Sequence, residues 1–483
     1  MDNLDVFVKS AENGDPMAAD NAAVAQIWET VANYRAADHG GDRLRVHLVL
    51  RSQALADTLK RLPLADDLAE NAELYAYTKE DLWAMELLGI RPGSTTRLDL
   101  QPVTANSPKF VHLVLFGASE QSESLAVHTS LTAHFPNYCR DNTLRTRITM
   151  VADSLDEFHH FQQRYRNLLA HSYRRVVVVD GDEIRCEELA PQYAGRRDDF
   201  VDVEWEFVAG SSDNDVISYK LQKWSGVENR LLTLAFCYPD DARNVNEMLT
   251  LPTEVLSTTP VWLHVRDDRA VNFLKQSGKF ANVIPFGMVD AKLPDMSLFI
   301  RMAQCVNFAY SHLRETTREE QAQGRPAMEV AVEVPTNRQL QELWNNKRLT
   351  TPKRWSNVYN AFTLRCKMHS LGHPDDDWNT LFAISDQDVE ILSEVEHNRW
   401  SVEELILGYR PATETEHAEI LNDITLRSKL KADFIHDDLR SFRELGVDET
   451  GLSVVRYDSG LTRTLPLVAY IYYQLNMNHH GRL

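Results

Sequence analysis

The residues best suited to bind a small ligand form one unbroken run, Glu396-His397-Asn398-Arg399-Trp400. If the run is helical, Glu396, Arg399 and Glu403 share one face of the helix, and His397 and Trp400 share the adjacent face. An aromatic ring beside an arginine and a histidine offers a stacking surface and hydrogen-bond donors, which a purine or another flat nucleotide group requires. We therefore expect part of a ligand pocket on this helix.

A second polar group, His436, Asp437 and Asp438, falls near the expected start of a later helix and could approach the first one. Structural interpretations remain open for both groups. The two aspartates could cap the later helix at the positive end of its dipole. Glu396 and Arg399 could form an ordinary surface pair, and Trp400 could belong to the core. Taken together, the residues favour a pocket.

Six motifs follow one another in the C-terminal part of the chain: Pro352-Lys-Arg-Trp-Ser-Asn357, Leu371-Gly372, Leu392-Ser-Glu-Val-Glu-His-Asn-Arg-Trp400, Gly408-Tyr-Arg410, Phe434-Ile-His-Asp-Asp-Leu-Arg440 and Thr462-Arg-Thr-Leu-Pro466. Over residues 338–475 this series resembles the prokaryotic domain related to the ryanodine-receptor (RyR) repeat. Tyr409 stands where the family usually has a tryptophan, and the glycine that commonly follows is absent. The resemblance implies a nucleotide-type pocket between helices. It adds five candidate binding residues: Trp355, Asn357, Tyr409, Arg410 and Arg463.

The first half of the chain alternates short apolar runs with helical patterns. We expect strands at residues 44–50, 73–77, 95–100, 110–116, 147–152, 176–179, 203–208, 231–237, 261–265 and 282–286. Continuous runs of valine, leucine and isoleucine are typical of strands buried on both faces, and strands that alternate with helices imply a mainly parallel sheet. The fold class is therefore an α/β, doubly wound, Rossmann-like region, followed by an α-helical domain.

The order of these elements resembles the TrkA N-terminal (RCK-like) Rossmann domain of potassium-transport regulators. The resemblance rests on residues 111–117, 147–153, 231–241, 261–268 and 282–288, with a further half unit at 43–101. It implies a dinucleotide site at the loop Gly117-Ala-Ser-Glu-Gln-Ser122 and at Asp153, with Ser119 and Ser122 as further contacts.

This loop departs from the dinucleotide fingerprint. Only the first glycine is present, Glu120 would repel a pyrophosphate, and Ser122 occupies the place of the third glycine. A degenerate site, in which Gly117 serves only a tight turn, is the favoured interpretation. We expect no redox NAD site here, and the identity of any cofactor stays open.

The pattern predicts five segments along the chain. They are an N-terminal arm (1–40), a βα half unit (41–104), the TrkA-N-like Rossmann domain (105–295), a helix and linker (296–336) and the RyR-like helical domain (337–483). In the last two segments we expect helices at 298–314, 338–345, 357–370, 386–407, 432–445 and 466–475, with a charged linker at 318–326. Ser385 and Asp388 form a capping signature ahead of the fourth of these helices.

Charge and composition exclude several classes of function. The formal net charge of -20 argues against direct binding of nucleic acid, because phosphates require a basic surface. Five dispersed cysteines indicate a reducing compartment, and no apolar run is long enough to cross a membrane, so we expect a cytoplasmic protein. Metalloprotease, hydrolase and P-loop signatures are absent from the sequence, and we assign no metal ligand and no catalytic residue.

We therefore expect a cytoplasmic nucleotide sensor that changes its assembly or its partner contacts on binding a nucleotide-type small molecule. Family association places such a role in bacterial signalling or antiviral defence, and implies a homo-oligomer. Two alternatives stay open. One is a regulatory subunit of a potassium or other cation transporter, with a membrane-protein partner. The other is an enzyme that hydrolyses or modifies a nucleotide, with His397, His436 and nearby carboxylates as acid and base.

Overall fold

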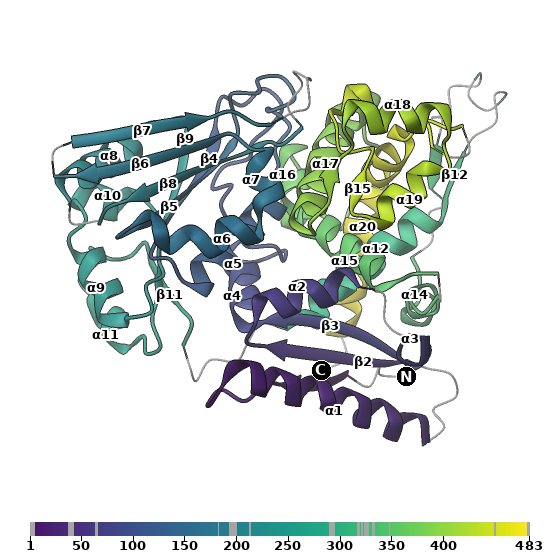
Figure 1. Ribbon diagram of the computed structural model, residues 1–483, viewed down its shortest axis with the longest axis horizontal. Helices are drawn as coiled ribbons and strands as arrows, with labels where there is room; N and C mark the ends of the chain where they lie inside the picture. Colours follow the sequence, from purple (N-terminus) through teal and green to yellow (C-terminus); the bar gives the residue numbers. More distant parts are fainter. Residues whose placement is uncertain are drawn as a thin grey trace.

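The computed structural model describes residues 5–36, 43–62, 66–181, 183–192, 200–211, 214–288, 295–315, 319, 322, 328–330, 334–346, 348–448 and 451–480. Within these ranges the chain forms a small parallel sheet, a large, mainly parallel sheet and a helical body. Figure 1 shows the large sheet on the left, the helical body on the right and the small sheet below. The predicted mainly parallel α/β region, followed by helices, is confirmed.

The small sheet is wholly parallel in its described part. It contains β1 (Asp5–Lys9), β2 (Leu44–Leu50) and β3 (Ala72–Thr78) in that order. The helices beside it are α1 (Pro16–Ala36), α2 (Gln53–Arg61), α3 (Asp66–Asn71) and α4 (Lys79–Leu87). The segment expected as an N-terminal arm, residues 1–40, therefore contributes β1 and α1 to a sheet, although residues 1–4 and 37–40 lie outside the described ranges.

The large sheet has the strand order β11-β10-β9-β4-β5-β8-β6-β7. The strands are β4 (Phe110–Phe116), β5 (Thr146–Ala152), β6 (Arg174–Asp180), β7 (Glu183–Leu189), β8 (Val203–Ala209), β9 (Arg230–Phe236), β10 (Val261–His264) and β11 (Val283–Phe286). From β8 to β11 the order matches the 3-2-1-4-5-6 arrangement of doubly wound folds. β6 adds a parallel strand beyond β8, and β7 pairs antiparallel with β6 at the edge.

Alternate residues of β4 pack into two separate apolar clusters. Val111, Leu113 and Leu115 face a cluster that includes α5 (Glu120–Thr132), whereas Val114 and Phe116 face one formed with α8, α9 and α11 on the other side. The last three helices are α8 (Asp215–Ser225), α9 (Asp241–Leu249) and α11 (Arg269–Lys275). Because helices cover both faces, this strand is apolar except for His112, which is hydrogen-bonded to Thr149.

The helical body packs around α12 (Met296–Ser311), which contacts α15 (Thr351–Phe362) and α20 (Val455–His480). The other helices are α14 (Asn337–Trp344), α16 (Leu364–Ser370), α17 (Asp386–Ile406), α18 (Glu414–Asn422) and α19 (Leu426–Ala432). α17 also packs against α5 and against α7 (Arg166–Ala170), so one apolar core runs from the large sheet into the helical body. None of the helices in the described ranges combines the length and apolar character of a membrane span.

Three predicted elements are wrong or incomplete. Residues 95–100 form no strand, because Arg97 and Asp99 turn to His369 of α16 instead of pairing along a sheet. The predicted helix at 432–445 does not form. The chain leaves α19 at residue 432 and pairs β15 (Ile435–His436) with β14 (Arg410–Pro411). The predicted helix at 357–370 is two helices, α15 and α16, and most of the predicted linker at 318–326 lies outside the described residues.

Candidate functional site

The helix α17 carries the central residues of the site. Ser385 caps it, since its hydroxyl accepts a hydrogen bond from the backbone N–H of Asp388 at 3.1 Å, which confirms the predicted start. The residues 396–403 lie in the C-terminal half of the helix, where it is buried between α15 and α20. A residue on this stretch is therefore held by packing on several sides.

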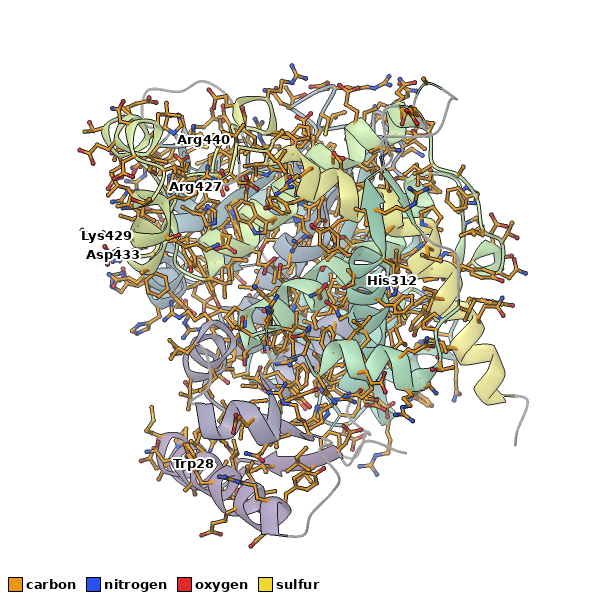
Figure 2. The ribbon with its side chains drawn as sticks, turned by 90° about the vertical axis from the view of Figure 1, so that its right-hand side faces the viewer. Trp28, His312, Arg427, Lys429, Asp433 and Arg440 are labelled. Atoms are coloured by element: carbon orange, nitrogen blue, oxygen red, sulfur yellow. The ribbon has the colours of Figure 1, made fainter. Side chains whose placement is uncertain are left out.

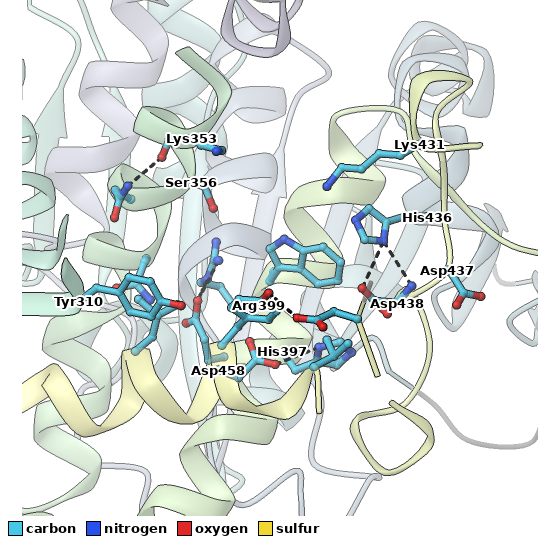
Figure 3. Close-up of a pocket in the computed structure, with 18 of the residues that line it drawn as sticks. Tyr310, Lys353, Ser356, His397, Arg399, Lys431, His436, Asp437, Asp438 and Asp458 are labelled. Atoms are coloured by element: carbon cyan, nitrogen blue, oxygen red, sulfur yellow. Dashed lines mark hydrogen bonds and ion pairs between the residues drawn. The ribbon is translucent and has the colours of Figure 1, made fainter. Parts of the chain in front are cut away.

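A cavity of about 710 Å³ opens beside α17. Its walls come from α12, α15, α17 and α19, from the turn after β15 and from the N-terminal part of α20 (Figure 3). Eight of the twelve residues predicted from the RyR-like motifs line it: Asn357, Glu396, His397, Arg399, Trp400, His436, Asp437 and Asp438.

The other four predicted residues lie elsewhere. Trp355 is 1% exposed in the core, where its ring contacts Tyr75 and Tyr359. Arg463 forms an ion pair with Asp386 at 2.8 Å on the surface. Arg410 pairs with Glu416 at 2.7 Å, and Tyr409 packs on His436 from outside the cavity lining. These residues support the walls or the surface and are not part of the lining.

Four alternating charges lie buried behind the cavity wall. Arg399 donates to Glu396 at 2.9 Å and to Glu403 at 2.6 Å, and Lys367 of α16 bonds to the other oxygen of Glu396. Burial alone would raise the pKa of Glu396, but Arg399 and Lys367 lower it to about 2. The predicted shared face of the first three residues is confirmed, and the pair of Glu396 with Arg399 is internal rather than a surface pair.

His397 joins three segments. Its Nε2 donates to the carbonyl of Arg440 at 2.8 Å, and its Nδ1 lies 3.4 Å from the carboxylate of Asp458 in α20. Burial lowers the pKa of His397, but Asp458 outweighs burial and raises it above the ordinary value. Because both ring nitrogens are engaged, this histidine ties α17 to its neighbours.

The pKa of His436 is shifted in the opposite direction from that of His397. The backbone N–H of Asp438 donates to its Nδ1 at 3.2 Å, so the ring proton lies on Nε2. Burial and nearby cations hold its pKa well below the ordinary value, so the ring is neutral. It packs edge-on against Trp400, with ring centroids 4.8 Å apart. The two rings form an aromatic corner of the cavity wall with one N–H donor. His436 ends β15 and the two aspartates follow that strand, so the group does not lie at a helix start as predicted.

The aspartates of the turn are paired within the protein. Asp437 accepts from His417, Arg427 and Arg440, and Asp438 accepts from Arg427 at 3.0 Å. Their interpretation as the N-cap of a helix is therefore wrong. They anchor Arg427 of α19, which places that helix against the cavity.

Sequence reasoning missed the cations and amides of two walls. Lys353 and Asn360 lie on α15 beside the predicted Asn357, at a spacing of three and four that the sequence already contains. Arg427 and Lys431 lie on α19, a helix that was not predicted. The spacing of residues on α15 could therefore have identified Lys353 and Asn360. Arg427 and Lys431 could not be identified in this way, because the helix was predicted at 432–445 and not at α19.

The residues of the candidate cofactor loop of the large sheet already contact or bond to other residues of the chain. Gly117 has a φ of +93°, and a Cβ there would meet the backbone of Tyr238 at 2.8 Å. Ser119 caps α5 and donates to the carbonyl of Cys237 at 2.6 Å, and the buried Ser122 completes the cap. Asp153 forms two hydrogen bonds with Arg243.

In the described ranges, no three histidine, cysteine, aspartate or glutamate side chains gather as metal ligands would. Comparisons of the chain with models of protein families, with curated proteins and with solved structures found no significant match.

Proposed function

We propose that the chain is a sensor whose RyR-like helical domain binds a nucleotide-type small molecule in the cavity beside α17. The observation that carries the proposal is the aromatic part of the wall, formed by the face of Trp400 and the neutral His436 set edge-on to it, in a cavity of about 710 Å³. Small-molecule sites in proteins have volumes of about 300–1,000 Å³ and combine apolar or aromatic walls with a few placed polar groups. The cavity has both features.

The histidines favour binding over acid–base chemistry. His397 has both nitrogens engaged by Arg440 and Asp458, and His436 has its Nδ1 occupied by a backbone N–H. Neither ring has a free basic nitrogen to accept a proton from a reacting group. The proposal is therefore a binding protein, and it does not include hydrolysis of the ligand.

The origin of the cavity walls supports a sensing role. An occupant would contact helices that are distant in sequence, from α12 to α20, and would fix their relative positions. A ligand that prefers one arrangement of these helices shifts the population toward it. The proposal extends to a change in assembly or in partner contacts, in bacterial signalling or antiviral defence.

Thermal unfolding of the full chain with ATP, NAD, ADP-ribose and cyclic nucleotides tests the proposal. We expect at least one to raise the unfolding midpoint, as a ligand at 100 times its Kd stabilises by about 2.7 kcal/mol. Trp400→Ala should abolish the increase. Arg463→Ala is the matched control, since this residue lies on the same domain outside the cavity. A ligand-induced increase that persists in Trp400→Ala would contradict the proposal, and light scattering with the ligand would report a change in assembly.

A further inference from the structure

Two lysines face the cavity without an ion-pair partner among the described residues. Lys353 lies on α15 and Lys431 on α19, and both are largely exposed. In Figure 3 they lie on the same side of the cavity, above Arg399 in that view and on either side of the gap between the two helices. The aspartates of the turn after β15, which could have neutralised them, are already bound to Arg427, His417 and Arg440.

Two further donors that belong to lining residues are buried and unused. The side-chain amide nitrogen of Asn360 has no hydrogen-bond partner among the described residues, although the residue is only 5% exposed. The Nε of Arg427 is also buried without a partner, while the Nη2 of the same guanidinium binds the aspartates. An unmet buried donor costs about 1–3 kcal/mol, so an acceptor supplied by a ligand would be favourable.

The acidic groups of the cavity have no comparable spare capacity. Glu396 is bound by Arg399 and Lys367, and Asp458 is bound by His397. The neutral His436 adds one more N–H donor. The unused hydrogen-bonding groups are therefore donors on the walls formed by α15 and α19, and they match a ligand that carries several acceptor oxygens and negative charge.

We infer that the cavity contains a diphosphate subsite, in which the phosphate oxygens of the ligand bridge Lys353 and Asn360 of α15 to Lys431 and Arg427 of α19. The inference rests on the proposed function and narrows its ligand to a nucleotide with at least two linked phosphates, with the base against Trp400. Bound phosphates would also hold α19, which has no buried residue of its own, against the helical body.

Titration calorimetry on the full chain, with inorganic pyrophosphate as the probe, tests the subsite directly. We expect the Kd to rise about tenfold in Lys353→Gln and in Lys431→Gln, because each removes one charge-assisted hydrogen bond. Lys429→Gln is the matched control: this lysine is on the same helix, is exposed, and lies at the outer edge of the molecule in Figure 2. Its Kd should change less than about twofold. Succinate, a dicarboxylate, should bind more weakly than pyrophosphate.

ADP and adenosine separate the subsite from the proposed function. Tighter binding of ADP than of adenosine, lost in both lysine variants, supports the subsite. Absence of pyrophosphate binding, or equal binding by both lysine variants and the wild type, overturns it. If ADP and adenosine bind equally and both depend on Trp400, the subsite is wrong and the proposed function stands. If the binding of pyrophosphate depends on both lysines while Trp400→Ala changes the binding of no nucleotide, the subsite stands and the proposed function is wrong.

Discussion

At the scale of single residues, Arg399 has the most constrained side chain of the site. It is 1% exposed, and its guanidinium is shared between Glu396 and Glu403. Removing one partner of a buried ion pair leaves an uncompensated charge in a medium of low polarity. The arginine therefore stabilises the wall of the cavity, and its own charge is not available to a ligand.

Replacing this arginine should be costly. We expect Arg399→Met to lower the free energy of unfolding by about 3–5 kcal/mol, because the buried Glu403 loses its counter-charge and Glu396 keeps only Lys367. Arg463→Met is the control, since its partner Asp386 is 84% exposed; it should cost less than about 1 kcal/mol. Urea unfolding of both variants measures the difference. Equal losses in the two variants would show that the buried network contributes no special stability.

Glu404 makes the stability depend on pH. Burial and the neighbouring Glu403 raise its pKa from 4.5 to about 8, against the opposing effects of Lys431, Arg399 and a hydrogen bond with Trp400. The folded state therefore holds this proton more tightly than the unfolded state. Its contribution to stability is fully present below a pH of about 4.5 and is lost as the pH rises through about 8.

Glu404→Gln should remove this part of the pH dependence. Urea unfolding between about pH 5 and pH 9, a range that includes the raised pKa, should show a smaller loss of stability in the variant than in the wild type. His397, whose pKa is also raised, contributes in the same direction and remains in both proteins. Identical pH profiles would mean that Glu404 titrates normally.

Residue types and spacing predicted part of the site, since eight of the twelve predicted residues line the cavity. Spacing on one helix determines which residues share a face, so the contact of Glu396 with Arg399 was predictable. Spacing does not determine which neighbour covers that face. Trp355 therefore lies in the core and Arg463 on the surface, although both belong to the same motif series.

At the scale of elements, two N-caps of the helical body provide a direct comparison. Ser385 accepts a hydrogen bond from the backbone of α17, whereas Thr350, at the start of α15, makes no such bond with its side chain. We expect Ser385→Ala to lower the free energy of unfolding by about 1 kcal/mol and Thr350→Ala to lower it by clearly less. Chemical unfolding measures both. A larger loss in Thr350→Ala would contradict this account of the caps.

The elements that were predicted correctly are those whose structure follows from the residue pattern within the element itself. The central strands β4 and β9 of the large sheet are mostly apolar because both faces are covered, and this pattern is local. β7 was missed because its residues are mostly charged and exposed. The segments 95–100 and 432–445 were wrong because distant partners determine them: His369 for the first, and β14 for the second.

At the scale of the whole molecule, the helical body and the α/β region are joined by polar contacts as well as by the shared core. Arg365 of α16 donates to the carbonyls of Gly89 and Ser94 at 2.6 Å and 3.0 Å. Asn167 of α7 donates to the carbonyls of Gly408 and Tyr409 at 2.7 Å and 2.9 Å. The second contact lies just beyond the end of α17, close to the strand β14 that pairs with the His436 segment.

The contact of Asn167 is one polar link between the helical body and the helix α7 beside the large sheet. We expect ligand binding to slow amide hydrogen exchange in α7, and Asn167→Ala to remove this effect while the cavity still binds. Hydrogen-exchange mass spectrometry with and without ligand measures both. Protection of α7 that persists in Asn167→Ala would show that the coupling runs elsewhere, for example through the packing of α17 on α7.

Coupling free energies between two sites are equal in both directions. If ligand binding in the cavity stabilises α7, a partner that binds and stabilises α7 must raise the affinity of the cavity for its ligand by the same factor. Through the carboxamide of Asn167, the protein would then respond to two binding partners. A macromolecule bound to the α/β region would set the ligand concentration at which the cavity of the helical body is filled.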